Sequence, residues 1–185
     1  MTWFVKRLLT VTDADVEQLV DVLIDCVDGG ASVSFMAPLT RERALAFWRR
    51  VAQGVHDGRR ALIVAEDENG VCGTVQLIFD LPENQPHRAD VAKMLVHRRA
   101  RRQGIAEALM RAAESTALEC GKTLLVLDTV TGTTAERLYT RLGWTRVGEI
   151  PEYALMPDGV PCPTTYFYRK LAATPPWRPL DDTSP

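Results

Sequence analysis

The sequence lacks several features that would assign the protein to a common class. Its 185 residues hold no apolar run near the roughly 20 residues that a membrane-spanning helix needs. Charged residues follow Met1 too soon for a secretory signal, because Lys6 and Arg7 interrupt the first apolar residues. Positive charge is not in excess, since the net charge is −2, which argues against a general nucleic-acid-binding protein. We therefore expect a cytoplasmic protein that binds neither a membrane nor a nucleic acid.

Cysteine and histidine are too few and too scattered for a metal centre. The chain has 4 cysteines and 3 histidines, with no C-x-x-C pair and no histidine at ligand spacing. We expect no bound metal, and no disulfides in a cytoplasmic protein of this size. None of the histidines has a partner at the spacing of a catalytic triad. Apolar residues make up 46% of the chain, enough for one domain over residues 1–171. The proline-rich segment 172–185 is predicted to be a disordered tail.

Hydrophobic periodicity predicts alternating strands and helices. Asn69-Gly70 between two apolar runs is a strong hairpin signal. The proline-rich segment 148–163 is predicted to be a long connection without strands. The predicted helices cover 13–28, 40–56, 103–120 and 135–142, and the predicted strands cover 3–9, 60–66, 71–79, 88–96, 123–127, 144–147 and 165–171. This order predicts an α/β (α+β) domain: a mixed, mostly antiparallel sheet with helices on both faces.

Residues 94–110 carry the strongest functional signal. An apolar strand ends at Val96, a loop with four arginines and Gly104 follows, and an amphipathic helix begins at once. The start of a helix exposes unpaired N–H groups at the positive end of the helix dipole. This junction is therefore a predicted anion site, and a phosphate-bearing cofactor is the expected occupant. A Cβ at Gly104 would crowd a phosphate or demand a backbone angle that only glycine adopts cheaply.

Two motifs give the chain a resemblance to a known family. Residues 101–106 read Arg-Arg-Gln-Gly-Ile-Ala, which matches Q/R-x-x-G-x-G/A, and residues 135–144 match A-x-x-L-Y-x-x-L-G-[FW]. In this order the motifs resemble the GNAT superfamily of N-acetyltransferases over residues 3–171. A narrower resemblance, to the tabtoxin-resistance type of acetyltransferase, is carried by residues 29–36, 127–129, 148–154, 156–159 and 163–167.

The resemblance implies a GNAT-like fold with two splayed central parallel strands, and acetyl-CoA as the cofactor. Cofactor binding is then expected from the backbone of one strand end and from the first motif, namely Met94, Leu95, Val96, Arg101, Arg102, Gln103, Gly104, Ile105 and Ala106. One or two of the loop arginines are expected to contact the phosphates, Arg101 being the preferred one, and the rest are expected to be solvated. Many relatives have asparagine where this chain has Gly132, so Thr131 or Thr133 would have to replace that contact, or it is absent.

The resemblance also implies which side chains move protons. Tyr139 is expected to be the general acid that protonates the departing thiolate, the alternative being a core tyrosine. Asp128 and Asp90 are expected to bind the amine and to accept its proton, directly or through water. The alternatives are a turn cap for Asp128 and a solvated or salt-bridged acid for Asp90, where tabtoxin-type relatives carry glutamate. Substrate-binding residues would be Ser32, Phe35, Met36, Trp48, Tyr153 and Asp158.

The predicted function is acetyl-CoA-dependent N-acetylation of a primary amine on a small molecule, by direct transfer in a ternary complex. If the narrower resemblance holds, the acceptor is an amino-acid-like toxin or antibiotic and acetylation confers resistance. Other acceptors in the same class are a peptide N-terminus, a polyamine or an aminoglycoside. A catalytically silent acyl-CoA sensor is the alternative from a different class. A homodimer is compatible with the sequence, which offers no specific support for one.

Overall fold

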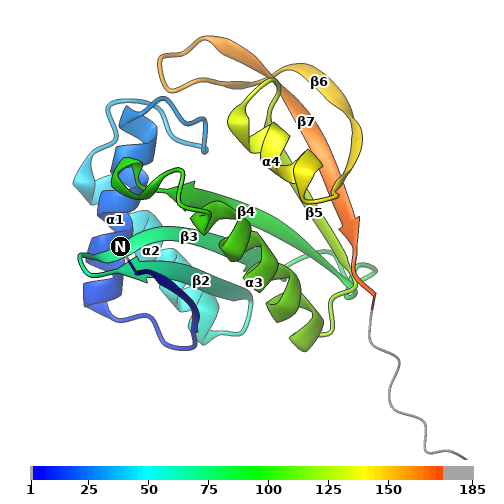
Figure 1. The fold of residues 1–185 in the computed structure, drawn as a ribbon, viewed down its shortest axis with the longest axis horizontal. Coiled ribbons are helices and arrows are strands. Elements are labelled where there is room, and N and C mark those ends of the chain that lie inside the picture. The colour runs from blue at the N-terminus through cyan, green and yellow to red at the C-terminus, as the bar shows by residue number, and fades with distance from the viewer. Residues whose placement is uncertain (1, 173–185) are drawn as a thin grey trace, which may run out of the picture.

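The computed structural model describes residues 2–172, which form a seven-stranded sheet with helices on both faces (Figure 1). The predicted tail therefore lies, except for Ala172, outside the described residues. The sheet order is β1-β2-β3-β4-β5-β7-β6. In chain order the elements are β1 Phe4–Leu8, α1 Asp13–Asp28, α2 Arg41–His56, β2 Arg60–Asp67, β3 Gly70–Ile78, β4 Arg88–Val96, the short 3₁₀ helix η1 Arg98–Ala100, α3 Ile105–Glu119, β5 Leu124–Val130, α4 Thr134–Arg141, β6 Thr145–Leu155 and β7 Pro161–Lys170.

Strands β4 and β5 form the one parallel pair in this sheet, and they pair only over their first residues. The parallel register runs from Arg88 opposite Leu124 to Asp90 opposite Val126. Beyond it the two strands separate, and β5 continues with β7 and α4 away from β4 (Figure 1). The predicted mixed, mostly antiparallel sheet with a central splay is confirmed. The splay leaves backbone groups of both strands without a partner in the sheet, facing the opening between them.

Each face of the sheet has its own hydrophobic core. Helices α1 and α2 cover one face, where Leu19, Leu23 and Trp48 are fully buried. Helix α3, together with α4, covers the other face around Leu109 and Phe167. Alternate residues of β2 supply the two cores in turn, as expected for a strand buried on both sides. No helix within residues 2–172 is both long and apolar enough to cross a membrane.

Three of the four α-helices begin with a threonine cap. The hydroxyls of Thr12, Thr40 and Thr133 accept hydrogen bonds from backbone N–H groups in the first turns of α1, α2 and α4. Such caps satisfy N–H groups that lack a partner inside the helix, and each contributes roughly 1 kcal/mol. Helix α3 differs, because it begins after Gly104 and has no side-chain cap.

The predicted long connection at 148–163 is wrong. Strand β6 continues to Leu155, and β7 already starts at Pro161, so the two strands form a long hairpin. Proline is tolerated here because β6 is an edge strand and its pairing with β7 is interrupted between Ile150 and Ala154, around Pro151. Most of β6 is exposed, so it shows none of the hydrophobic alternation that identifies a strand from sequence.

Candidate active site

The opening between β4 and β5 begins at a β-bulge in β4. Thr74 of β3 pairs with Leu95 and Gln76 pairs with Ala92, so Lys93 and Met94 together face Val75. A bulge bends the strand and changes the direction of its side chains. The bulge places the end of β4, with Met94, Leu95 and Val96, beside the opening. The Val96 carbonyl already accepts a hydrogen bond from Arg101 Nε at 3.1 Å.

The N-terminus of α3 fits an anionic group. Gly104 has a φ of 83°, and a Cβ placed there would meet only a ring carbon of Trp3 at 3.9 Å. The space in front of the helix is therefore open, and no side chain caps the first turn. Ile105 and Ala106 belong to that turn, while Gln103 is exposed just before it. Uncapped N–H groups beside open space match the needs of a diphosphate.

The four arginines of the basic loop have different partners. Arg98 forms an ion pair with Asp25 of α1, and Arg99 forms one with Asp67 at the end of β2. Most of the loop arginines other than the phosphate ligand were predicted to be solvated, but these two anchor the loop. Arg101 is exposed and bonds the Val96 carbonyl. Arg102 is exposed and has no side-chain partner among the described residues, so Arg101 and Arg102 remain for a phosphate.

Asp90 and Asp128 lie on the same face of the sheet. Their neighbours Ala89, Leu125 and Leu127 belong to the core under α3, so the two carboxylates point to the opposite face. Burial raises the pKa of Asp90, and the adjacent Arg88 partly offsets the shift. Loss of solvation also raises the pKa of the more exposed Asp128; the charge of Lys93 partly offsets this increase, and that of Asp90 adds to it.

The alternatives for the two carboxylates fare differently. Asp90 lies 3.3 Å from a guanidinium nitrogen of Arg88, so its salt-bridged role is present in the structure. Within residues 2–172, the Asp128 side chain makes no hydrogen bond that would cap the turn after β5. Asp128 is therefore the carboxylate with the freer acceptor oxygens.

Tyr139 comes from α4 and lies on the side of the sheet that α3 covers. It is 5% exposed, and its ring packs 6.0 Å from the rings of Trp144 and Phe167. Burial raises the pKa of the phenol, and the charge of Asp128 adds to the shift. The hydroxyl has no hydrogen-bond partner in the described part of the chain. Tyr139 is thus a core residue whose proton is not engaged by another protein group.

The predicted substrate-binding residues do not all meet in one place. Ser32 donates a hydrogen bond to the Leu155 carbonyl at 2.9 Å, which joins the α1–α2 loop to the β6–β7 hairpin. Phe35 of the same loop packs against Phe47, with ring centroids 5.2 Å apart. Met36 is exposed nearby in the sequence. Trp48 is instead fully buried in the core under α1 and α2, which favours a structural role.

Two further predicted residues belong to the β6–β7 hairpin. The Tyr153 hydroxyl accepts a hydrogen bond from the Tyr166 hydroxyl at 2.6 Å. Tyr166 pairs with Asp128 across β7 and β5, so this contact connects the hairpin to the opening. Asp158 lies exposed in the turn, where its carboxylate accepts a bond from the Val160 N–H. Asp158 is thus already used in the turn.

Neither Thr131 nor Thr133 has a free hydroxyl that could replace the asparagine of many relatives. Gly132 occupies this position, and the hydroxyl of Thr131 is hydrogen-bonded to that of Thr165 at 2.8 Å. The Thr133 hydroxyl donates to the Val130 carbonyl while it caps α4. Of the two outcomes considered from the sequence, the structure favours loss of this cofactor contact.

Sequence reasoning gave no role to Lys93, Phe47 or Tyr166. A charged residue inside the apolar run 91–96 was the available signal for Lys93. Tyr166 offered none, because its position beside Asp128 depends on the pairing of β5 with β7.

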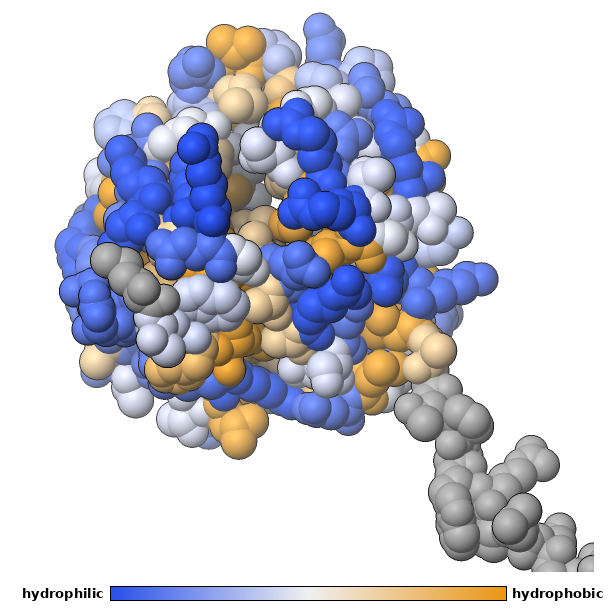
Figure 2. Space-filling model, in the orientation of Figure 1, coloured by the Kyte–Doolittle hydropathy of each residue, from blue (hydrophilic) through white to orange (hydrophobic). Residues whose placement is uncertain are grey.

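The surface of the molecule is hollowed between the side that carries α1 and α2 and the side that carries α4, β6 and β7 (Figure 2). This hollow is consistent with the separation of β4 from β5.

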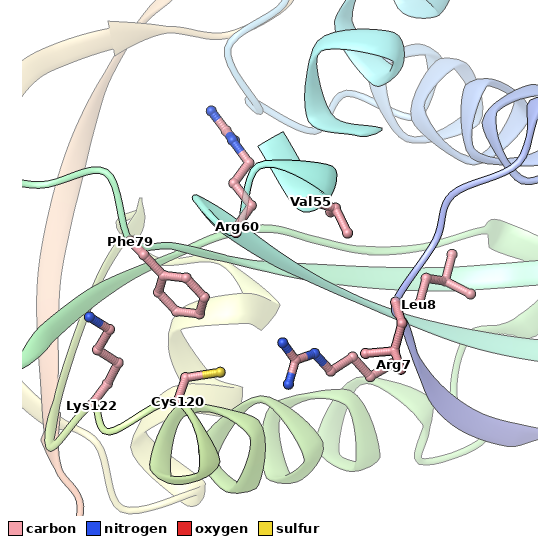
Figure 3. Close-up of a pocket in the computed structure, with 9 residues that line it drawn as sticks. Arg7, Leu8, Val55, Arg60, Phe79, Cys120 and Lys122 are labelled. Atoms are coloured by element: carbon pink, nitrogen blue, oxygen red, sulfur yellow. The ribbon is translucent and has the colours of Figure 1, made fainter. Parts of the chain in front are cut away.

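A separate pocket of about 260 Å³ lies at the other end of the sheet (Figure 3). Cys120 and Lys122 line it between the end of α3 and the start of β5, opposite Arg7 and Leu8. None of the predicted site residues lines this pocket. It is therefore distinct from the opening between β4 and β5.

The described residues contain neither a metal cluster nor an activated thiol at the opening. Within residues 2–172, no group of three or more His, Cys, Asp or Glu side chains could hold a metal ion. Cys26, Cys72 and Cys162 are buried. Burial raises the pKa of the Cys72 thiol to about 11 and also raises that of Cys26, which leaves both thiols protonated near neutral pH.

Comparisons with known proteins agree with the fold and the motifs. The family model for the acetyltransferase (GNAT) domain matches residues 58–146. An uncharacterized N-acetyltransferase from the hisH-hisA intergenic region of Azospirillum brasilense is 30% identical over 126 residues, which span 67% of this chain and 73% of that protein.

Solved structures with the same fold include yncA of Salmonella typhimurium, described as an acetyltransferase and solved with its cofactor acetyl-CoA. It is 17% identical with a TM-score of 0.75, over 92% of this chain and 94% of that one. A ribosomal-protein-alanine N-acetyltransferase from Brucella melitensis is 20% identical with a TM-score of 0.77, over 91% and 99% of the two chains. The sheet with its central splay, the uncapped glycine junction and the sequence match lead to one conclusion: the chain belongs to the GNAT family of acetyl-CoA-dependent N-acetyltransferases.

Proposed function

We propose that this enzyme acetylates a primary amine on a small, amino-acid-like molecule by direct transfer in a ternary complex. The observation that carries the proposal is the shared position of Asp90 and Asp128 on one face of the sheet at the opening. Tyr139 lies on the side that α3 covers, and the charge of Asp128 contributes to the raised pKa of its phenol. If the acceptor is a toxin or antibiotic, as in the tabtoxin-resistance type that the sequence resembles, acetylation of its amine would confer resistance.

Holding the cofactor is assigned to the α3 N-terminus and the end of β4. When bound, acetyl-CoA supplies an activated acetyl thioester. The uncapped N–H groups after Gly104 would hold its diphosphate, assisted by Arg101 and Arg102. Backbone groups of Met94, Leu95 and Val96 do not pair with β5. They would bind the remaining part of the cofactor, in the manner of an added strand.

Proton transfer is assigned to the carboxylates and the phenol. An amine must lose its proton before it can attack, and Asp128 is the base with the freer oxygens. Loss of solvation raises its pKa, which makes it a stronger base than an ordinary aspartate. Asp90, paired with Arg88, would act through a water or hold the ammonium. The Tyr139 phenol keeps its proton because burial raises its pKa, so a proton is available for the leaving thiolate.

Direct transfer is favoured because Cys26 and Cys72 are poor candidates for a thiol that would carry the acetyl group. A thiol must ionise to attack a thioester, and burial raises the pKa of both Cys26 and Cys72. Neither thiol is therefore suited to form a covalent acetyl-enzyme.

A thiol-release assay over a panel of primary amines tests the proposal. We expect release of free thiol with at least one amine. When both substrates are varied, the double-reciprocal plots of the initial rate should give intersecting lines. Parallel lines would indicate a covalent intermediate and contradict direct transfer. Acetyl-CoA binding without thiol release for any amine would instead favour the silent sensor.

A further inference from the structure

Lys93 occupies a strained position in the middle of β4. It lies in the bulge opposite Val75 and has a φ of 53°, in the left-handed region that non-glycine residues rarely adopt. Such conformations cost free energy and concentrate at functional sites. The bulge is needed to open β4 from β5, but it does not by itself require a lysine. The choice of side chain therefore calls for a separate explanation.

The Lys93 side chain reaches the face of the sheet where Asp90 and Asp128 lie. Its Nζ donates a hydrogen bond to Ser34 Oγ at 3.1 Å and lies 5.7 Å from the centroid of the Phe47 ring. Ser34 also has a positive φ, of 72°. Two residues in unfavourable backbone conformations thus meet above the sheet, where the α1–α2 loop covers it. Phe35 completes this wall by packing on Phe47.

The Lys93 ammonium has no ionic partner in the part of the chain described here. No carboxylate oxygen lies within 4.0 Å of it, although Asp128 is close enough to influence it electrostatically. Burial lowers the pKa of Lys93; the charge of Asp128 partly offsets this decrease, and that of Arg60 adds to it. A half-buried ammonium without a carboxylate partner is unfavourable unless another group supplies the negative charge.

One ion pair lies on this face of the sheet, since Arg88 is 3.3 Å from Asp90. Arg60 keeps its charge, but its guanidinium donates to the neutral Gln76 side chain at 2.9 Å. Asp128 and Lys93, one negative and one positive, have no ion pair within 4.0 Å in the described part of the chain. This arrangement complements a molecule with one ammonium and one acidic group. It does not suit a polyamine, which would need several carboxylates.

We propose that Lys93 binds an acidic group of the acceptor, such as a carboxylate, while Asp128 faces the amine that is acetylated. This assignment rests on the proposed function and narrows its acceptor to amines that carry an acid. Lys93 is thus a specificity-determining residue, held in position by Ser34 and the aromatic wall of Phe35 and Phe47.

The test compares acids with their matched neutral amides. Acceptors are α-amino acids and β-alanine, each paired with its primary amide, and the variants are Lys93→Met, Lys93→Arg and the control Lys122→Met. We expect the wild type to favour the acid over the amide in kcat/KM by roughly tenfold to a hundredfold, the value of one charged hydrogen bond. Lys93→Met should lose this preference mainly through KM, and Lys93→Arg should recover part of it. Lys122 lies at the far end of the sheet, and its variant should behave as wild type.

A binding measurement separates this inference from the proposed function. Calorimetry on the enzyme without cofactor compares N-acetyl amino acids with N-acetyl amino-acid amides, and the acids should bind more tightly only when residue 93 is cationic. If no amine is acetylated but the N-acetyl amino acids still bind more tightly than their amides, the proposed function is refuted and the binding of an acidic group by Lys93 is supported.

Two results would overturn the inference. One is equal use of acids and amides by the wild type together with equal binding of their acetylated forms. The other is an equal loss for both classes of acceptor in Lys93→Met, because this would mean that Lys93 only positions Asp128.

Discussion

Replacing Gly104 with valine should remove cofactor binding and leave the fold in place. A Cβ at this position meets nothing closer than Trp3 at 3.9 Å, so the protein leaves room for the first atom of the new side chain. The substitution should lower the stability of the fold because the φ of residue 104 is 83°. An L-residue in this region costs roughly 1–2 kcal/mol. For a chain of this size that corresponds to a fall in Tm of roughly 2–8 °C, well within the usual margin of stability.

The effect on acetyl-CoA should be much larger than the effect on stability. The new side chain would stand in the open space before the first turn of α3 and keep a diphosphate from its N–H groups. Loss of one or two charged hydrogen bonds, at roughly 1.5–3 kcal/mol each, weakens binding by at least about tenfold. Calorimetric titration with acetyl-CoA measures this change, and thermal unfolding measures the stability.

Gly121 provides a matched control on the same helix. It follows the C-terminal end of α3 with a φ of 71°, and a Cβ added there would have no atom within 4 Å. Gly121→Val should therefore lose a similar amount of stability and keep its affinity for acetyl-CoA. Wild-type affinity in Gly104→Val, or an equal loss of affinity in both variants, would refute the assignment of the diphosphate to the α3 N-terminus.

Three further predictions concern the reacting groups and the basic loop. Tyr139→Phe should lower kcat by roughly a hundredfold or more with unchanged acetyl-CoA affinity and Tm, because the hydroxyl has no partner in the described residues; a wild-type kcat would leave Tyr139 as a core residue only. As the pH drops, kcat/KM should fall because the base Asp128 is protonated, and the midpoint of this fall should lie above the usual aspartate range because the pKa of Asp128 is raised. Asp128→Asn should remove this fall, and an unaltered pH profile would exclude Asp128 as the base. Asp25→Ala should cost roughly 1–2 kcal/mol in denaturant unfolding, because its carboxylate accepts from both the Arg98 backbone and side chain; Asp21→Ala, on the exposed side of the same helix, should cost no more than about 0.5 kcal/mol, and equal losses would contradict a structural role for Asp25.

Local features of the fold were predictable because short segments determine them. Asn69-Gly70 predicted the β2–β3 hairpin, and hydrophobic periodicity predicted the bounds of α1, α2 and α4 to within one residue. The glycine junction before α3 was likewise visible, since its chemistry resides in consecutive residues. These signals require no knowledge of residues distant in the chain.

Features that depend on distant residues were not predictable. The β6–β7 hairpin was hidden because β6 is an exposed edge strand interrupted near Pro151. The ion pair between Arg98 and Asp25 joins residues 73 positions apart, so the sequence alone suggested a solvated arginine. The environment of Lys93 depends in the same way on how the α1–α2 loop closes over β4.

A crystal structure with coenzyme A and an N-acetylated amino acid would show how the opening holds both molecules. We expect the diphosphate on the N–H groups that follow Gly104 and the sulfur within hydrogen-bond distance of the Tyr139 hydroxyl. We also expect the acetylated nitrogen on the side of Asp128. A diphosphate bound elsewhere, or a Tyr139 hydroxyl turned away from the sulfur into the core, would contradict these assignments.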